Sequence, residues 1–126
     1  RLVYGLEEVP QAILDAKSNA QANRIRNVSF FHGKAEYQLS RIYKQNRSRC
    51  DVLVLDPPRK GCDPNVLHTI AAMDPKRIVY VSCDPATLAR DAAILVKHGY
   101  AVAKVQPVDM FPHTVHVESV CLLRKQ

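Results

Sequence analysis

Long apolar runs are absent from this sequence of 126 residues. None approaches the ~18 residues that a membrane-spanning helix needs, so we expect no membrane-spanning segment in it. Internal repeats, low-complexity tracts and linkers are also missing. No basic-then-apolar leader is visible in these residues, and together with the cysteine usage this predicts a cytoplasmic setting.

Closely spaced cysteine pairs are absent as well. The four cysteines, Cys50, Cys62, Cys83 and Cys121, form no C-x-x-C pair. Zinc-ribbon and thioredoxin-like sites are therefore excluded, and we expect free thiols. His113 and His116 lie close together but lack a third ligand nearby, so we expect no metal.

The sequence also lacks a dense block of Lys and Arg, although the chain is basic overall. Eighteen Lys and Arg face twelve Asp and Glu, which gives a net charge of +6. This balance fits either a polyanionic partner such as nucleic acid or a generally basic, solvated surface. The group of basic residues that comes closest to such a block is Arg41, Lys44, Arg47 and Arg49. We interpret it as a solvated helix face and loop.

What is present is an ordinary globular composition, 47% hydrophobic and 24% charged. Its length and composition suit one domain, residues 1–126. Apolar periodicity and the positions of proline and glycine predict alternating elements. The expected strands are 2–6, 27–32, 51–55, 77–81, 100–105 and 115–123, and the expected helices are 10–23, 35–46, 65–73 and 86–97.

Strands that alternate with helices indicate an α/β fold with a largely parallel sheet. The nearly all-apolar strand 51–55 is expected at the centre of that sheet, covered on both faces. The last two strands are joined by a short loop and are expected to form an antiparallel hairpin. Because the first residues already have the pattern of a strand, we expect the chain to be a piece of a longer protein.

The segment 77–91 combines a β-branched strand, a cysteine and the start of a helix. Cys83 follows the strand, and Pro85 opens the next element. The carboxyl ends of strands in open α/β sheets are where ligands and chemistry collect. We therefore predict that Cys83 is a nucleophile, although a lone cysteine is more often an inert core residue. A nearby cation from Arg59, Lys60 or Arg90 would favour the thiolate.

Three acids have comparable positions. Asp56 follows the apolar strand 51–55 and is either a functional carboxylate or a helix cap. Glu7 or Glu8 ends the first strand, where an acid can accept hydrogen bonds from ribose hydroxyls, or simply lies in a solvated turn. Glu118 lies in an apolar strand, an expensive place for a carboxylate and a suitable one for a general base.

Three motifs, taken together in this order and spacing, closely resemble the RNA uracil-C5 methyltransferase family, which makes 5-methyluridine. They are Asp-Pro-Pro-Arg-Lys-Gly at 56–61, Val-Ser-Cys-Asp-Pro-Ala-Thr-Leu-Ala-Arg-Asp at 81–91 and Asp-Met-Phe-Pro-His-Thr-Val-His-Val-Glu at 109–118. The resemblance covers nearly the whole chain. It implies a class I Rossmann-like methyltransferase fold that binds S-adenosylmethionine. The chain would be the carboxyl-terminal part of the catalytic domain.

The resemblance also implies roles for single residues. Cys83 would attack uracil C6, and Glu118 would remove the C5 proton. Glu7 would bind the cofactor's ribose, Asp56 would be the cofactor-side acid, and Ala35 would contact the adenine. Arg59, Lys60 and His113 would hold or orient the RNA, whose target uridine must leave its stack.

The same resemblance carries further expectations. Arg59-Lys60-Gly61 resembles the branch that modifies large-subunit ribosomal RNA, and the alternatives are the transfer-RNA T-loop uridine or a non-catalytic RNA-binding fragment. The glycine-rich cofactor loop and its strand, together with any RNA-binding domain, would precede Arg1, and the fragment alone would not bind cofactor well. Asp84 stands where the family usually has Asn, which adds a negative charge beside Cys83.

Overall fold

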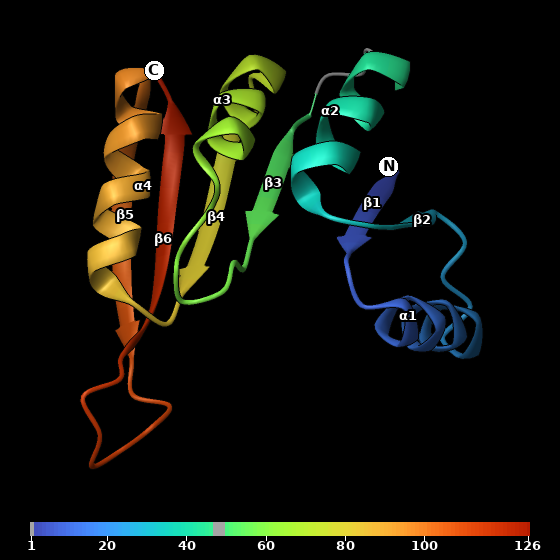
Figure 1. Ribbon diagram of the computed structural model, residues 1–126, viewed down its shortest axis with the longest axis horizontal. Helices are drawn as coiled ribbons and strands as arrows, with labels where there is room; N and C mark the ends of the chain where they lie inside the picture. The colour runs from blue at the N-terminus through green and yellow to red at the C-terminus, as the bar shows by residue number, and fades with distance from the viewer. Residues whose placement is uncertain (1, 47–49) are drawn as a thin grey trace. The chain divides into compact units, whose positions relative to one another are not determined.

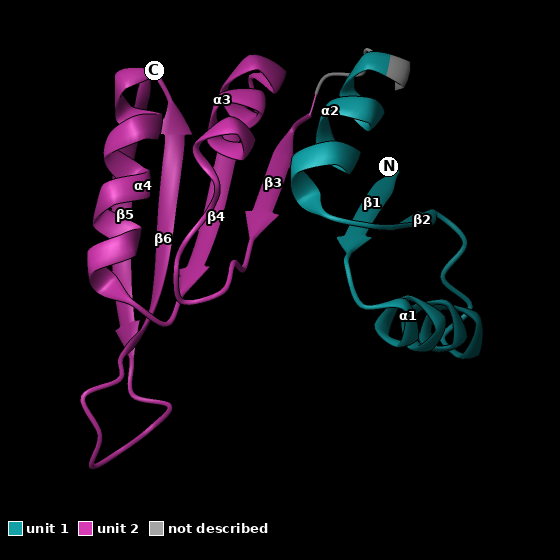
Figure 2. Ribbon diagram, in the orientation of Figure 1, with its two compact units in different colours: residues 1–47 teal, residues 48–126 magenta. Residues whose placement is uncertain are grey.

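The computed structural model describes residues 2–46 and 50–126. The chain divides into two compact units, unit 1 spanning Arg1–Arg47 and unit 2 spanning Ser48–Gln126, coloured separately in Figure 2. Arg47 and Arg49 of the predicted basic cluster lie outside the described residues. No helix in the described ranges combines the length and apolarity that a membrane crossing requires.

Unit 1 is a two-stranded parallel sheet with two helices. Its elements are β1 Val3–Glu7, α1 Pro10–Ala22, β2 Val28–His32 and α2 Ala35–Asn46. Gly5 pairs with Phe30 on the face that carries α1, and Tyr4 packs edge-on against Phe31 on the other face. Leu39 and Ile42 of α2 are both buried.

Unit 2 is a four-stranded sheet in the order β3-β4-β6-β5. Its elements are β3 Val52–Leu55, α3 Pro64–Met73, β4 Arg77–Ser82, α4 Pro85–Lys97, β5 Tyr100–Val108 and β6 Glu118–Lys125. β3 and β4 are parallel, whereas β6 runs antiparallel to both β4 and β5. The predicted terminal hairpin is therefore confirmed, with its second strand inserted beside β4 (Figure 1).

The core of unit 2 lies between one face of this sheet and the helices α3 and α4 (Figure 1). Burial alternates along β4 and β6, as expected for strands with one covered face. The sheet contributes the buried side chains Ile78, Tyr80, Cys121 and Leu123 to this core, and the two helices contribute Leu67, Ile70, Leu88 and Leu95. Full burial of each large apolar side chain contributes about 1.5–3 kcal/mol.

An aspartate side chain caps the start of both α3 and α4. Asp63 accepts the N–H of Asn65 at 2.8 Å ahead of α3, and Asp84 accepts those of Ala86 and Thr87 at 2.8 and 2.9 Å ahead of α4. A proline follows each cap at a position whose N–H has no helical acceptor. These caps fix the point at which each strand-to-helix loop ends.

Two predictions from the sequence are wrong in detail. The last strand begins at Glu118 rather than at Val115, because the loop turns at His113 and leaves Val115 93% exposed. β3 lies at the edge of the four-stranded sheet rather than at a covered centre, and Val54 on it is 67% exposed. Among the described residues of unit 2, no element buries Val52 and Val54, although β3 is as apolar as a central strand.

Candidate active site

Two predicted residues become neighbours where β4 ends and β6 begins. Ser82, the last residue of β4, pairs with Ser119 of β6. Cys83 follows Ser82 just beyond the end of β4, and Glu118, the first residue of β6, precedes Ser119. The thiol and the carboxylate, thirty-five positions apart in the sequence, therefore each adjoin the last pair of the β4–β6 ladder.

Cys83 is half-buried, and its thiol is free. The turn that holds it is fixed on both sides by hydrogen bonds. The Ser82 hydroxyl donates to the carbonyl of Asp84 at 2.9 Å and accepts the Asp84 N–H at 3.1 Å. Cys83 is accordingly held at the carboxyl end of β4 by a hydrogen-bonded turn, and it remains partly exposed to solvent.

Asp84 caps α4 and stays ionised beside this thiol. Hydrogen bonds from the backbone N–H groups of Thr87 and then Ala86 hold the pKa of its carboxyl below the usual value, and the Arg59 charge adds to the effect. The extra negative charge expected from the sequence is therefore present, and the positive charge of Arg59 partly offsets it.

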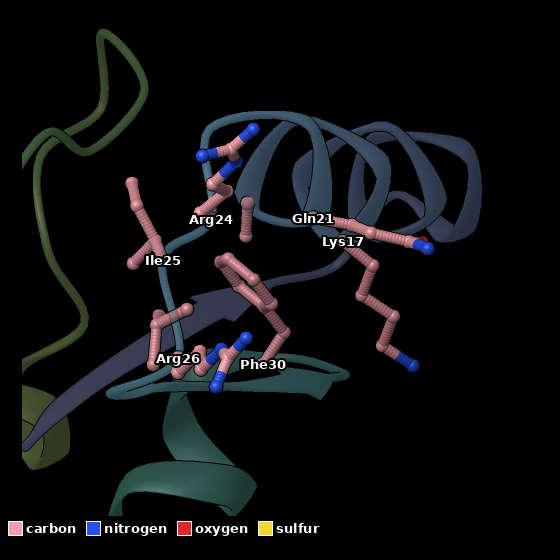
Figure 3. Close-up of a pocket in the computed structure, with 8 residues that line it drawn as sticks. Lys17, Gln21, Arg24, Ile25, Arg26 and Phe30 are labelled. Carbon is pink, nitrogen blue, oxygen red and sulfur yellow. The ribbon is translucent and has the colours of Figure 1, made fainter.

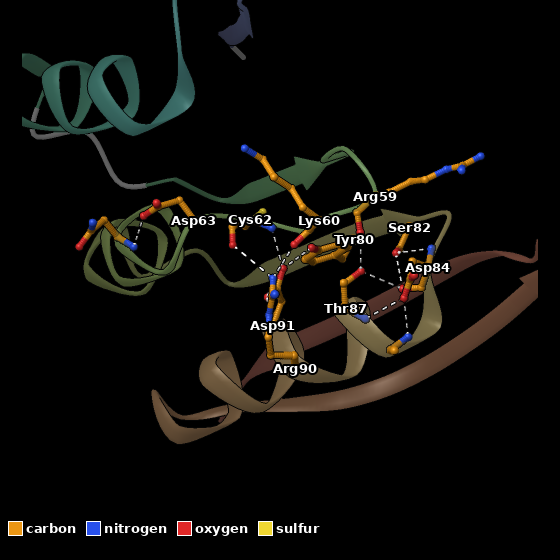
Figure 4. Close-up of polar contacts among 12 residues, drawn as sticks. Arg59, Lys60, Cys62, Asp63, Tyr80, Ser82, Asp84, Thr87, Arg90 and Asp91 are labelled. Atoms are coloured by element: carbon orange, nitrogen blue, oxygen red, sulfur yellow. Dashed lines mark hydrogen bonds and ion pairs between the residues drawn. The ribbon is translucent and has the colours of Figure 1, made fainter.

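The loop after β3 is fastened to α4 through a buried carboxylate (Figure 4). Asp91 is completely buried, and its Oδ2 accepts the Cys62 N–H at 2.7 Å and the Tyr80 hydroxyl at 2.5 Å. Its Oδ1 accepts the Arg90 side chain at 2.8–2.9 Å. Burial, followed by the bond to Asp91, raises the pKa of Tyr80 far above its usual range, so the phenol remains a donor.

Arg90 and Thr87 add further ties to the same loop. The Arg90 guanidinium donates to the carbonyl of Lys60 at 2.8 Å, and the Thr87 hydroxyl donates to that of Arg59 at 3.2 Å. The sequence suggested Arg90 as a possible cation for Cys83, but its guanidinium is engaged with Asp91 and the loop carbonyls. These bonds leave the exposed side chains of Arg59 and Lys60 on a fixed backbone.

Gly61 is the residue that allows this close approach. It is buried with φ of +76°, and a Cβ there would lie 2.5 Å from Arg90 Nη2 and 2.6 Å from Asp91 Oδ2. Any side chain would therefore displace the buried carboxylate and also strain the backbone. Asp56, at the start of the loop, is exposed and immediately follows β3.

A second loop, residues 109–117, extends beyond the same edge of the sheet (Figure 1). His113 lies on it, exposed and with a left-handed φ of +64°. Glu118 is half-buried at the point where this loop enters β6. The structure thus gathers Asp56, the loop with Arg59 and Lys60, Cys83, Glu118 and the His113 loop at one edge of unit 2.

Two predicted cofactor residues belong to unit 1. Glu7 ends β1, and its Oε1 accepts the N–H of Val9 at 2.7 Å. Ala35 is exposed at the first position of α2, just after β2. Both therefore lie at the carboxyl end of their own two-stranded sheet, where α/β proteins bind ligands.

The reasoning from sequence gave no role to Asp91 or Tyr80. The signal was present in part, because Arg90-Asp91 ends the second motif of the resemblance. An acid inside a helix whose neighbours are apolar, as in Asp91-Ala92-Ala93-Ile94, also predicts burial with partners. The sequence pattern did not show that the partners of Arg90 and Asp91 include a loop about thirty residues earlier in the chain.

Comparison with known families is decisive at the level of sequence. The profile of the family described as tRNA (uracil-5-)-methyltransferase matches residues 6–126. The chain belongs to this family. The resemblance inferred from the three motifs is therefore confirmed.

RNA methyltransferases of other organisms are similar to this chain along nearly its whole length. An uncharacterized RNA methyltransferase of Listeria innocua is 58% identical over 121 residues, which are 96% of this chain and 26% of the relative. One of Caldanaerobacter subterraneus is 52% identical over 123 residues, 98% and 27% of the two chains. The chain thus spans about a quarter of the length of the relatives it matches.

Solved structures extend the similarity to the fold. The Pyrococcus abyssi tRNA (uracil-54, C5)-methyltransferase, solved with S-adenosyl-L-homocysteine, is 33% identical, with a TM-score of 0.79 over 97% of this chain and 28% of that one. A precorrin-6y methyltransferase of Geobacter metallireducens is 18% identical, with a TM-score of 0.75 over 98% and 68% of the chains. The predicted Rossmann-like α/β methyltransferase fold is confirmed.

Proposed function

We propose that the protein of which this chain forms part methylates C5 of uracil in RNA, with Cys83 as nucleophile and Glu118 as the base for the C5 proton. The observation that carries the proposal is the register of β4 and β6, in which Ser82 pairs with Ser119. This pairing puts a half-exposed thiol and a half-buried carboxylate in adjacent positions at the edge where such sheets bind ligands.

The proposed reaction follows from the chemistry of uracil, whose C5 is a weak nucleophile. The Cys83 thiolate adds to C6, which turns C5 into the carbon of an enolate and divides one difficult step into two easier ones. S-adenosylmethionine, when bound, would supply the methyl group for that carbon from its sulfonium, which would leave as a neutral thioether. Glu118 then takes the C5 proton, the C5–C6 double bond re-forms, and the Cys83–C6 bond breaks to release the thiolate.

The residues present fit S-adenosylmethionine, and we propose that they bind it. Glu7 offers a carboxylate acceptor at the end of β1, which suits the two hydroxyls of a ribose. Ala35, without a bulky side chain at the start of α2, leaves room for a flat adenine. Asp56 adds a second exposed acid after β3. The relatives' greater length supports the further proposal that a preceding segment completes this site and covers β3.

The remaining roles concern the RNA. Arg59 and Lys60 are proposed to contact phosphates, and His113 to orient the flipped uridine. We propose large-subunit ribosomal RNA as substrate because of Arg59-Lys60-Gly61, and a cytoplasmic location with it. The transfer-RNA T-loop uridine is the second candidate, supported by similarity to the P. abyssi tRNA enzyme. Methyl-transfer assays on the two RNA classes separate these candidates.

The test of the chemistry uses the full-length protein and RNA that contains 5-fluorouridine. Fluorine cannot leave C5 as a proton does, so the reaction should stop as a covalent protein–RNA adduct that survives denaturing gels. Cys83→Ala should abolish the adduct, whereas the control Cys50→Ala should keep it. Glu118→Gln should trap a methylated adduct even with ordinary uridine RNA. An unchanged adduct in Cys83→Ala would overturn the assignment, and RNA binding without any adduct would favour the non-catalytic alternative.

A further inference from the structure

Unit 1 contains a groove that none of the proposed catalytic residues lines (Figure 3). It has a volume of about 400 Å³ and lies between the last turns of α1, the turn that follows, and β2. Its lining includes the cations Lys17, Arg24 and Arg26, with Gln21, Ile25 and Phe30 between them. Figure 3 shows the Phe30 ring in the middle of these side chains.

The groove has a one-sided charge. Three cations line it, and no acid does. Within the described residues of unit 1, no ion pair involves Lys17, Arg24 or Arg26. Unpaired cations gathered around one hollow repel one another and attract a polyanion, an attraction that increases with the number of phosphates neutralised.

An aromatic ring forms the floor. Phe30 is half-buried and pairs with Gly5 of β1. A Cβ on Gly5 would lie 2.8 Å from Phe30 Cδ1, so the ring lies directly over the glycine. The ring is thus supported from below and bordered by cations, the combination with which proteins bind single-stranded nucleic acid.

The backbone around the groove is fixed before any ligand binds. Ile25 donates its N–H to the Ala20 carbonyl at 2.8 Å, and Arg24 donates to that of Gln21 at 3.0 Å. Arg24 has a left-handed φ of 56°, a conformation that favours glycine and costs an L-residue about 1 kcal/mol. A cation held at such a position is consistent with a binding role.

We propose that this groove binds a single-stranded segment of the RNA substrate, with phosphates against Lys17, Arg24 and Arg26 and one unstacked base against Phe30. The proposal rests on the RNA substrate of the proposed function but on none of the residues that carry its chemistry. The occupant is assigned by charge complementarity, because three unpaired cations and a ring match phosphates and a base. Long RNA would thus have a second anchor outside the target uridine.

The experiment measures binding of a fluorescein-labelled single-stranded oligouridylate to the full-length protein across a salt series. The double variant Arg24→Gln/Arg26→Gln removes two cations from the groove. The matched control, Arg41→Gln/Lys44→Gln, removes two exposed cations from α2 of the same unit. Two lost phosphate contacts should reduce the slope of log K against log salt by about 1.4, whereas the control should leave it unchanged.

A third variant tests the ring separately. Phe30→Leu keeps an apolar floor but removes the stacking surface, so affinity should fall about tenfold at an unchanged salt slope. Melting temperatures of all variants check that they fold. Equal slopes for the groove variant and the control would overturn the proposal, including the case in which the groove instead holds an acidic segment of another protein.

The result is distinguishable from that for the catalytic proposal. At saturating 5-fluorouridine RNA, the groove variant should still form the Cys83 adduct, because the chemistry lies elsewhere. A slope change without any adduct in the wild-type protein would support the groove and refute the proposed reaction. An adduct without a slope change would do the reverse.

Discussion

Two loops meet the same edge of the sheet in unit 2, and they are built in opposite ways. The loop of residues 56–63 is tied to α4 by hydrogen bonds from Thr87 and Arg90 and to the buried Asp91. The loop of residues 109–117 is almost entirely exposed, and its hydrogen bonds among the described residues are local, such as that from the Thr114 hydroxyl to the Phe111 carbonyl at 2.7 Å.

The two loops can therefore contribute to substrate binding in different ways. A loop held by buried bonds presents its side chains in one arrangement before the substrate arrives, which lowers the ordering cost of binding. A loop with only local bonds can adapt to a substrate and loses entropy when it does. We therefore expect the first loop to tolerate few changes and the second to tolerate many.

The largest expected effect is that of Asp91→Ala. The substitution removes the carboxylate that accepts the buried Tyr80 hydroxyl and the part-buried Cys62 N–H and that pairs with Arg90. The free energy of unfolding should fall by about 3–5 kcal/mol in urea denaturation. The control Asp63→Ala, which removes only the cap of α3, should cost about 1 kcal/mol. Equal losses would mean that the first loop is no better anchored than an ordinary helix start.

Gly61→Ala should have the next effect. Its Cβ would collide with Arg90 and Asp91 and would also occupy a left-handed backbone. We expect a loss of about 2–3 kcal/mol in the free energy of unfolding. Gly99→Ala is a matched control, because φ is +86° there and the nearest atom to a Cβ is 3.6 Å away. The difference between the two variants isolates the clash, and no difference would show that the loop yields easily.

The contrast between the loops also explains what could be predicted from the sequence. The strands, helices and caps followed from local signals, such as Asp-Pro at 63–64 and 84–85 and the apolar runs of β3 and β4. Cys83 and Asp56 were singled out by their places after strands, and Glu118 by its place within an apolar strand. The shared edge of Cys83 and Asp56 then followed from the rule that parallel strands end together. Glu118 lies at the same edge because β6 is antiparallel to β4 and begins where β4 ends.

The parts that sequence missed depend on long-range contacts. Asp91 finds its partners in a loop about thirty residues earlier, and the loop owes its course to Gly61. The position of β6 between β4 and β5 could not be predicted from the sequence either. A hairpin pattern does not show which of its two strands pairs with the rest of the sheet. The start of β6 was misjudged because valines alternate into the loop, where only a folded core distinguishes Val115 from Cys121.

Lowering the pH should remove the stabilisation that the Asp84 carboxylate gives to the start of α4. Because the folded-state pKa of Asp84 is below its usual value of 3.8, its cap contributes stability above that value and loses it as the pH falls further. Asp84→Asn keeps a capping side chain without the charge. Wild type should therefore melt higher than the variant at pH 7, and the gap should shrink below about pH 4. A gap that is constant down to pH 2.5 would contradict this account.

The smallest effect on stability is expected for His113→Ala in the adaptable loop. Its side chain is exposed and the hydrogen bonds of its loop are local, so the free energy of unfolding should change by less than about 0.5 kcal/mol. If His113 orients the uridine, the variant should nevertheless form the 5-fluorouridine adduct more slowly at saturating RNA. Thr114→Ala is the control, because it disturbs the loop's own hydrogen bonds and leaves the imidazole intact. A slower adduct in Thr114→Ala alone would mean that the loop's shape matters and its histidine does not, and the division between a fixed loop and an adaptable one would then have to be redrawn.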